Sequence, residues 1–434
     1  MKRDYWMMEN IPDEILECIF HYISTYELCT VVSEVCKQWK FIIMHQVMSI
    51  KDANQLKMCH EGLRAVIVTE RVWNLCAASR VITCATQMIP RLQELTICSN
   101  FPLDDEDYKS LMYIPHLKHL DVFSKRKYID KNININASIT TLVVNDAMAS
   151  GFLKNLSESN KLSGLHMYGR AQYYIVRQMV DFLQIQSGKL QELTLRCQEL
   201  GDEKFKIISQ CVGLVSLQLY QCSLLTKRSI AHVASLPKLR RLHLTGARLL
   251  RSSGILELIN SLPPLIEDLN LSYSDFGSEH CTALALRLPR LAALELWRCG
   301  AGLGGVGLGG AGLGGAGLGG AGLGGAGLGG AGLGGAALLR LVQQARRLRV
   351  LDTDVHFDAL QLQALGDHPA LRKLRCRWDG PTPLVGSKLN ITSALKVYSK
   401  EYLRGDGEGP SAELFYYWTR GVDLKSLFEG DLTL

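Results

Sequence analysis

A short pattern of leucines returns along most of this 434-residue chain. In the clearest copies, leucines stand at the first, fourth and sixth positions of a six-residue segment. These copies begin at Leu190, Leu214, Leu239 and Leu291. Weaker copies, with Ile or Val in place of a leucine, begin at Leu63, Leu92, Leu117, Ile139, Leu162, Ile266, Leu348 and Leu371. Successive copies start 22 to 29 residues apart, except for one interval of 57 residues.

A period of about 20–29 residues with this signature is typical of a leucine-rich repeat, in which each unit adds a strand and a helix to a solenoid. The fourth and sixth positions lie two apart, so on a strand both side chains point to the same side. Neighbouring units must stack because no single unit can bury these leucines. We therefore predict an α/β solenoid of about twelve repeats over residues 49–378, with parallel strands on the concave side and helices on the convex side.

Composition agrees with a folded chain and limits the classes of function. Hydrophobic residues make up 47% of the chain, enough for a core, and the net charge of +6 is too mild to indicate a nucleic-acid binder by itself. The 13 cysteines show no Cys-x-x-Cys pair and no zinc-ligand spacing, so we expect reduced thiols, no metal site and no cofactor. Reduced cysteines and the lack of a signal-peptide core favour a cytoplasmic or nuclear location.

Residues 8–48 differ from the rest of the chain and predict three short helices. Apolar residues recur at helical spacing, Pro12 fits the first turn of a helix, and Ser24 with Glu27 has the spacing of a capping box. Three helices in about forty residues cannot enclose much core. We therefore expect part of their apolar surface to face a partner.

Two stretches of this segment resemble the F-box, a family that opens with Leu-Pro-x-Glu-Ile/Leu-Leu and closes with Val-Cys-Lys-x-Trp. They are residues 11–16, Ile-Pro-Asp-Glu-Ile-Leu, and residues 35–39, Val-Cys-Lys-Gln-Trp; Ile11 is a mild departure. The resemblance implies docking onto the Skp-type adaptor of a cullin-RING ubiquitin ligase. The positions it implies for this contact are Ile11, Pro12, Ile15, Leu16, Ile19, Phe20, Leu28, Val35, Cys36 and Trp39. The alternative is an unrelated helical cap at the open end of the solenoid.

The fuller repeats, such as residues 211–222, resemble the cysteine-containing subtype of leucine-rich repeat, which is often joined to an F-box. Strand residues that alternate with the buried leucines are expected on the concave side, where exposed aromatic and arginine side chains are typical of binding hot spots. The candidate client-binding residues are Phe123, Tyr168, Arg196, Tyr220, His243, Trp297, Lys373, Arg375 and Arg377. For each ring, the alternative is a ladder in which it packs against its neighbours.

The last two repeats carry a cluster of positive charge, with Arg346, Arg347 and Arg349 around Leu348 and with Lys373, Arg375 and Arg377 at concave positions of the final repeat. Such a cluster would fit an acidic or phosphorylated client segment, because arginine pairs well with phosphate. A solvated basic edge is the alternative.

Residues 301–335 are seven pentapeptides of the type Ala-Gly-Leu-Gly-Gly, with Val306 as the one variant. Without these 35 residues the interval of 57 becomes 22, an ordinary repeat length. We predict a flexible insert between the strand and the helix of one repeat, and neither a membrane span nor a phosphate loop. Residues 379–434 break the leucine rhythm and are expected to form a C-terminal cap or a partner site; the sequence leaves both open.

No catalytic motif is present, so we expect a protein that is not an enzyme. The F-box resemblance implies the substrate-recognition subunit of an SCF-type ubiquitin ligase, whose repeat array holds a client protein for ubiquitination and proteasomal degradation. One alternative is a leucine-rich-repeat scaffold or inhibitor outside the ubiquitin system. The other is a nucleic-acid binder that uses the basic end of the array, which is less supported because aromatic residues are few there.

Overall fold

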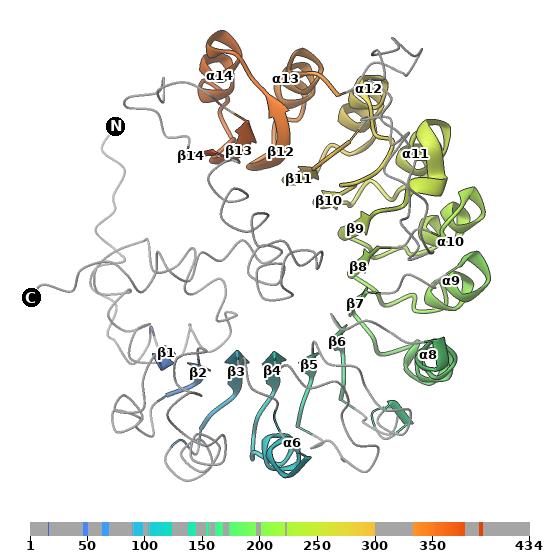
Figure 1. Ribbon diagram of the computed structural model, residues 1–434, viewed down its shortest axis with the longest axis vertical. Coiled ribbons are helices and arrows are strands. Elements are labelled where there is room, and N and C mark those ends of the chain that lie inside the picture. The colour runs from blue at the N-terminus through green and yellow to red at the C-terminus, as the bar shows by residue number, and fades with distance from the viewer. Residues whose placement is uncertain are drawn as a thin grey trace, which may run out of the picture. The chain divides into compact units, whose positions relative to one another are not determined.

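The chain divides into two compact units, which are described separately. The first comprises Met1–Arg196 and Asp406–Leu434, and the second comprises Cys197–Gly405. The computed structural model (Figure 1) describes residues 16, 47–50, 63–68, 89, 91–98, 103, 105–123, 138–144, 153–154, 156, 161–167, 173–196, 201–221, 224–299, 333–377 and 390–393.

In the first unit, seven strands lie in sequence order, each parallel to the next. They are β1 (Val47–Ile50), β2 (Ala65–Val68), β3 (Glu94–Cys98), β4 (His119–Phe123), β5 (Thr141–Val144), β6 (Gly164–Met167) and β7 (Glu192–Arg196). Its described helices are α6 (Asp105–Met112) and α8 (Tyr173–Gln186). The order of strand and helix agrees with one strand per repeat.

In the second unit, seven further parallel strands follow in sequence order. They are β8 (Ser216–Tyr220), β9 (Arg241–Thr245), β10 (Asp268–Asn270), β11 (Ala293–Leu296), β12 (Val350–His356), β13 (Lys373–Arg377) and β14 (Asn390–Ser393). The helices are α9 (Asp202–Ile208), η4 (Lys227–Ser229), α10 (Ile230–Ala234), η5 (Arg248–Leu250), α11 (Arg251–Ser261), α12 (Ser278–Arg287), α13 (Gly335–Gln344) and α14 (Ala359–Gly366). Helices line one side of these strands, and we call the opposite side the inner face (Figure 1).

The repeated leucines form the core between strands and helices. At the fourth and sixth positions, Leu217, Leu219, Leu242 and Leu244 are buried, as predicted from their spacing. They pack with the inward side of the helices, where Leu258 of α11 is also buried. Burying each such side chain contributes about 1.5–3 kcal/mol, which makes the stacked core the main stabilising term. The prediction of an α/β leucine-rich-repeat fold is confirmed.

A left-handed residue ends the strand in four successive repeats of the second unit. Gln221, Gly246, Tyr273 and Arg298 follow β8 to β11 and have φ values of 59°, 75°, 60° and 49°. Backbone hydrogen bonds tie these turns together, for example from Gly246 N to Ser272 O at 3.0 Å and from Tyr273 N to Trp297 O at 2.7 Å. Three of the four residues are not glycine, so tertiary contacts outweigh the intrinsic cost of this conformation.

The sheet extends past both predicted ends of the repeat array. Strand β1 lies partly within the segment expected to be purely helical, and β14 lies inside residues 379–434 and pairs in register with β13. Neither strand carries the full leucine pattern, which is why the sequence did not reveal them. Strand pairing is continued by backbone groups and does not require the leucines.

The glycine-rich tract leaves the strand register intact. Strand β11 pairs directly with β12, with Leu294 opposite Leu351, although 56 residues separate them in sequence. Helix α13 begins at Gly335, the last residue of the tract, so the tract lies between the strand and the helix of one repeat. Residues 301–332 themselves lie outside the described residues.

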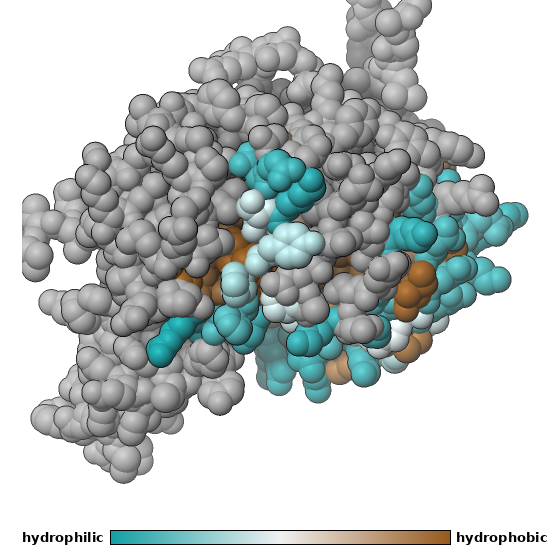
Figure 2. Space-filling model, turned by 90° about the horizontal axis from the view of Figure 1, so that it is seen from below, coloured by the Kyte–Doolittle hydropathy of each residue, from teal (hydrophilic) through white to brown (hydrophobic). Residues whose placement is uncertain are grey.

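The described surface seen from below is mainly hydrophilic, with hydrophobic residues in small separate patches (Figure 2). Within the described segments, no helix has both the length and the apolar character that a membrane crossing requires.

Candidate functional site

The inner face of the second unit carries a row of polar side chains that runs across its strands. Strand register places Gln218, His243, Asn270, Glu295 and Asp352 side by side. The row continues to Arg375 of β13, which is in register with Asp352. These residues alternate with the core leucines, so their side chains point away from the helices. We call them the inner polar row.

Three carboxylates lie along this face and their electrostatic environments differ. His243 Nε2 and Arg241 Nε each lie 3.1 Å from a carboxylate oxygen of Asp268. Burial raises the pKa of Asp268, but the attraction of these two groups outweighs burial and holds that pKa below its ordinary value. Burial raises the pKa of Glu295 well above its ordinary value, and repulsion from Asp352 and Asp268 adds to this. Glu295 accepts a hydrogen bond from Asn270 Nδ2 at 2.5 Å.

Asp352 is held by one hydrogen bond and one ion pair from neighbouring repeats. Trp297 Nε1 donates to Asp352 Oδ1 at 2.8 Å, and Arg375 Nη1 lies 3.1 Å from Oδ2. Burial raises the pKa of Asp352 to about 6, although Arg375, the Trp297 hydrogen bond and Lys373 act in the opposite direction. Glu295 and Asp352 both interact with Arg375 and Lys373, so the ionisation of one acid depends on that of the other.

The predicted exposure of the inner aromatic and histidine side chains is wrong for Tyr220, His243 and Trp297, which are 2%, 0% and 4% exposed. Each makes a polar contact instead: Tyr220 Oη donates to Gln218 Oε1 of its own strand at 2.8 Å, and His243 and Trp297 bond to Asp268 and Asp352 of the following repeats. Adjacent strands lie about 4.8 Å apart, so large side chains in register cover one another.

The other candidate client-binding residues have mixed outcomes. Lys373 is half-buried and Arg375 is paired with Asp352. Phe123, Arg196 and Arg377 belong to β4, β7 and β13, but only their backbone is described, and Tyr168 lies outside the described residues.

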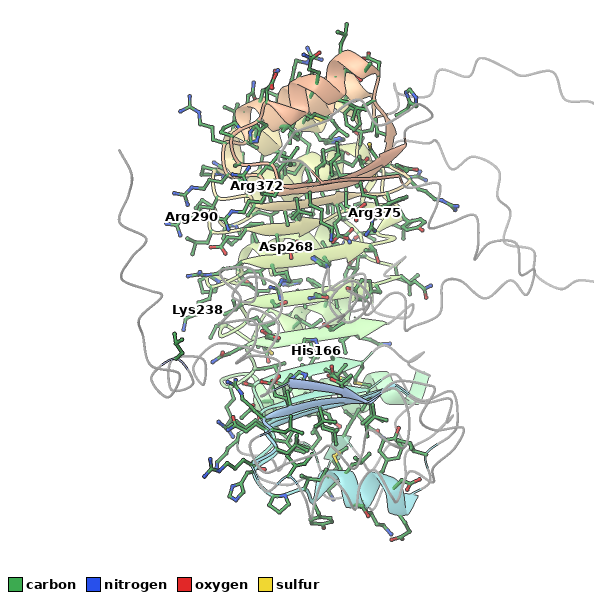
Figure 3. All side chains as sticks on the ribbon, turned by 90° about the vertical axis from the view of Figure 1, so that its left-hand side faces the viewer. His166, Lys238, Asp268, Arg290, Arg372 and Arg375 are labelled. Atoms are coloured by element: carbon green, nitrogen blue, oxygen red, sulfur yellow. The ribbon has the colours of Figure 1, made fainter. Side chains whose placement is uncertain are left out.

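The turns before β11, β12 and β13 form a basic edge, defined by Arg290, Arg346, Arg347, Arg349 and Arg372. All five side chains are exposed. Figure 3 shows Lys238, Arg290 and Arg372 along one side of the strands, whereas Asp268 and Arg375 lie over the inner face. The basic edge is therefore separate from the inner polar row.

The inner face of the first unit has a smaller polar cluster. His166 Nδ1 lies 2.7 Å from Thr194 Oγ1, and His166 Nε2 lies 3.2 Å from Glu192 Oε2. His119 Nε2 lies 3.0 Å from the buried Asp121. Among the described residues of either unit, no group of three or more His, Cys, Asp or Glu side chains could hold a metal ion.

Of the ten positions expected to contact an adaptor, the structure describes only Leu16. This residue is helical and its side chain is fully buried, and its contact with an adaptor stays a prediction. The remaining nine lie outside the described residues: Ile11, Pro12, Ile15, Ile19, Phe20, Leu28, Val35, Cys36 and Trp39.

Comparison with protein families bears on this N-terminal segment. Residues 8–48 match the family model described as F-box-like. The chain carries an F-box-like domain. The F-box-like domain precedes a leucine-rich-repeat array, the combination that the sequence predicted.

Solved structures with related folds include a chain of the yeast Rad7–Elc1 complex, 14% identical, with a TM-score of 0.52 over 87% of this chain and 92% of that one. The leucine-rich-repeat protein LegL7 of Legionella pneumophila is 11% identical, with a TM-score of 0.42 over 75% of this chain and all of that one. At such identities the first likeness concerns the fold alone. No curated protein sequence matches the chain.

Sequence reasoning missed Asp352, Arg290 and Arg372 as functional candidates. Asp352 occupies the fifth position of the motif that starts at Leu348, the same position as Glu295 in its repeat. Thr353 replaces the third leucine of that copy. Arg290 immediately precedes the first leucine of one motif, and Arg372 immediately follows the first leucine of another. A comparison of these flanking positions across the repeats would have found both arginines.

Proposed function

We propose that this chain is the substrate-recognition subunit of an SCF-type cullin-RING ubiquitin ligase. In this proposal the F-box-like domain docks onto a Skp-type adaptor, and the repeat array binds a client protein for ubiquitination and proteasomal degradation. The observation that carries the proposal is the F-box-like match at residues 8–48 in the same chain as a leucine-rich-repeat array. The yeast Rad7–Elc1 structure adds a precedent, because a protein with a similar fold was solved in a complex with a second protein.

The proposed mechanism is proximity and involves no catalytic residue of this chain. F-box proteins with leucine-rich repeats typically act as non-catalytic adaptor subunits, and the reactive ubiquitin thioester belongs to the partner enzyme. Holding a client beside that thioester raises the effective concentration of the client's lysines, which can contribute much of the rate. The proposed location is the cytoplasm or the nucleus.

Binding to a purified Skp-type adaptor tests this function. We expect the full chain to bind immobilised adaptor, and Ile15→Asp together with Trp39→Ala to weaken binding at least tenfold, because an apolar contact loses its centre. The matched control is Leu360→Asp, which places the same charge on an apolar side chain of α14 that is 79% exposed. The control should bind as the wild type does.

Two results would contradict the proposal. One is a wild-type chain that binds no Skp-type adaptor. The other is a double variant that remains folded and binds the adaptor with unchanged affinity. Either result would favour the scaffold or inhibitor alternative, in which residues 8–48 only cover the end of the array.

A further inference from the structure

The turns of the basic edge carry far more positive than negative charge. The three segments between helix and strand are residues 288–292, 345–349 and 367–372, with the sequences LPRLA, ARRLR and DHPALR. Against five arginines, these segments contain one acid, Asp367, which directly follows α14. Arg290, Arg346, Arg347 and Arg349 make no ion pair or side-chain hydrogen bond with any described residue, and Arg372 donates only to the backbone O of Leu371, at 3.0 Å.

The equivalent turns before β9 and β10 provide an internal comparison. Arg240 Nη1 lies 3.3 Å from Glu267 Oε1, and Arg241 Nε donates to Asp268 Oδ2 at 3.1 Å. There the chain supplies one carboxylate for each of these arginines. At β12 and β13 the corresponding pairs are Arg349 with Val350 and Arg372 with Lys373, and neither pair contains an acid. The positive charge of the basic edge is therefore available to a partner.

Backbone hydrogen bonds hold the charged positions close together. Arg349 N donates to Ala292 O at 2.8 Å, and Arg372 N donates to Arg349 O at 2.8 Å. Arg349 and Arg372 are therefore equivalent residues of adjacent repeats, about 4.8 Å apart along the sheet. Like charges at this separation repel each other, and an anion bound between them would relieve the repulsion.

We propose that the basic edge binds an acidic segment of the client protein, carrying aspartate, glutamate or phosphorylated side chains. This inference rests on the proposed function and specifies the chemistry of the client. In an extended peptide, the side chains on one side repeat every ~7 Å. The arginines of three adjacent repeats span ~10 Å, so two alternate acidic residues of such a peptide fit along the basic edge. Arginine pairs with carboxylate and phosphate through two parallel hydrogen bonds, which favours both sources of negative charge.

The same surface is a poor match for nucleic acid. Single-stranded binding needs aromatic side chains on which bases stack, and the three turns contain no Phe, Tyr or Trp. The basic edge also spans only three repeats, so it offers few contacts along a long phosphate backbone. An acidic peptide needs neither feature.

Fluorescence anisotropy of the full chain with short labelled peptides tests the inference. One peptide alternates Glu and Ser, a second carries phosphoserine at the Ser positions, and a third has Gln in place of Glu. We expect the two acidic peptides to bind at low salt, the Gln peptide to bind at least tenfold more weakly, and binding to fall as salt screens the charges. The difference between the first two peptides distinguishes carboxylate from phosphate recognition.

The decisive variant combines Arg347→Glu, Arg349→Glu and Arg372→Glu, which should weaken acidic-peptide binding at least tenfold. Its control combines Lys206→Glu, Arg228→Glu and Arg340→Glu, three exposed residues of helices in the same unit with the same change in net charge. The control should change affinity less than threefold. Replacing the same three edge arginines with Gln provides a milder second variant, which should also lose binding if the reversed variant fails to fold.

Three results would overturn the inference: no acidic-peptide binding at low salt, equal weakening by the control variant, or tighter binding of single-stranded RNA or duplex DNA that the edge variant abolishes. Adaptor binding is measured on the same preparations. A wild-type chain that binds peptide but no adaptor contradicts the proposed function only. A chain that binds adaptor but no peptide contradicts the basic-edge inference only.

Discussion

Replacing Glu295 with Gln should stabilise the second unit at neutral pH. Burial and the neighbouring Asp352 and Asp268 raise the pKa of Glu295, which means that the folded state disfavours its charged form. The hydrogen bond that its side chain accepts from Asn270 Nδ2 can be made equally well to the amide oxygen of Gln. The substitution therefore removes a repelled charge and keeps the hydrogen bond.

The size of the effect follows from strand geometry. Glu295 and Asp352 are directly opposite in register, which places their carboxylates roughly 6 Å apart. At an effective dielectric constant of about 20, two unit charges at this distance repel by about 3 kcal/mol. Glu295 avoids part of this cost by holding a proton, so we expect Glu295→Gln to raise the free energy of unfolding by about 1–2 kcal/mol at pH 7.5.

The effect should depend on pH with a definite sign. The folded pKa of Glu295 is raised, so its contribution to stability is fully present below the unfolded pKa of about 4.3 and is lost as pH rises through the folded pKa. Wild type and Glu295→Gln should therefore be equally stable near pH 4, and the variant's advantage should grow as the pH rises.

Native-state hydrogen exchange of peptides from β10 to β12 measures this locally, from about pH 5 upward, and urea denaturation extends the comparison to lower pH. The matched control is Glu257→Gln on the exposed side of α11, which should change stability by less than about 0.5 kcal/mol at any pH. A Glu295→Gln variant that is less stable than the wild type at pH 7.5, or whose advantage does not vary with pH, would refute this account of the inner polar row.

Three further variants test individual contacts of the fold. Trp297→Phe removes the donor to Asp352 and should cost about 1.5–3 kcal/mol, measured by hydrogen exchange in β11; an unchanged exchange rate would contradict the contact. Gly246→Ala places a side chain at a φ of 75° and should cost about 1 kcal/mol in urea denaturation, whereas Gly188→Ala, which has open space around it, should be nearly neutral. Asp358→Ala removes the cap of α14, in which Gln361 N donates to Asp358 Oδ1 at 2.8 Å, and should cost about 1 kcal/mol in thermal unfolding, with most of the loss recovered by Asp358→Ser.

The periodic leucines were enough to predict the strands from β2 to β13, because their burial depends on a local pattern that every repeat shares. Leu217 and Leu242, for example, are core residues for the same reason and at the same motif position. The strands β1 and β14 could not be predicted in this way, since backbone pairing adds them to the sheet without the leucine signal.

The inner face was harder to predict because exposure there depends on neighbours from other repeats. Alternation correctly places Trp297 and His243 on the inner face, but their burial follows from partners 55 and 25 residues away, Asp352 and Asp268. Hydrogen-bond partners at such separations are not encoded in any one motif. Conversely, the basic edge arises from residues beside the motif, such as Arg290 and Arg372, whose register becomes visible only when the repeats are stacked.

The central claim is that residues 8–48 engage a Skp-type adaptor while the repeat array remains free to hold a client. Hydrogen-exchange mass spectrometry of the full chain, with and without a purified Skp-type adaptor, tests it most directly. We predict slower exchange within residues 8–48 on adaptor binding and unchanged exchange in β8 to β13. Adaptor-induced protection confined to the strands of the array, with none in residues 8–48, would contradict the claim.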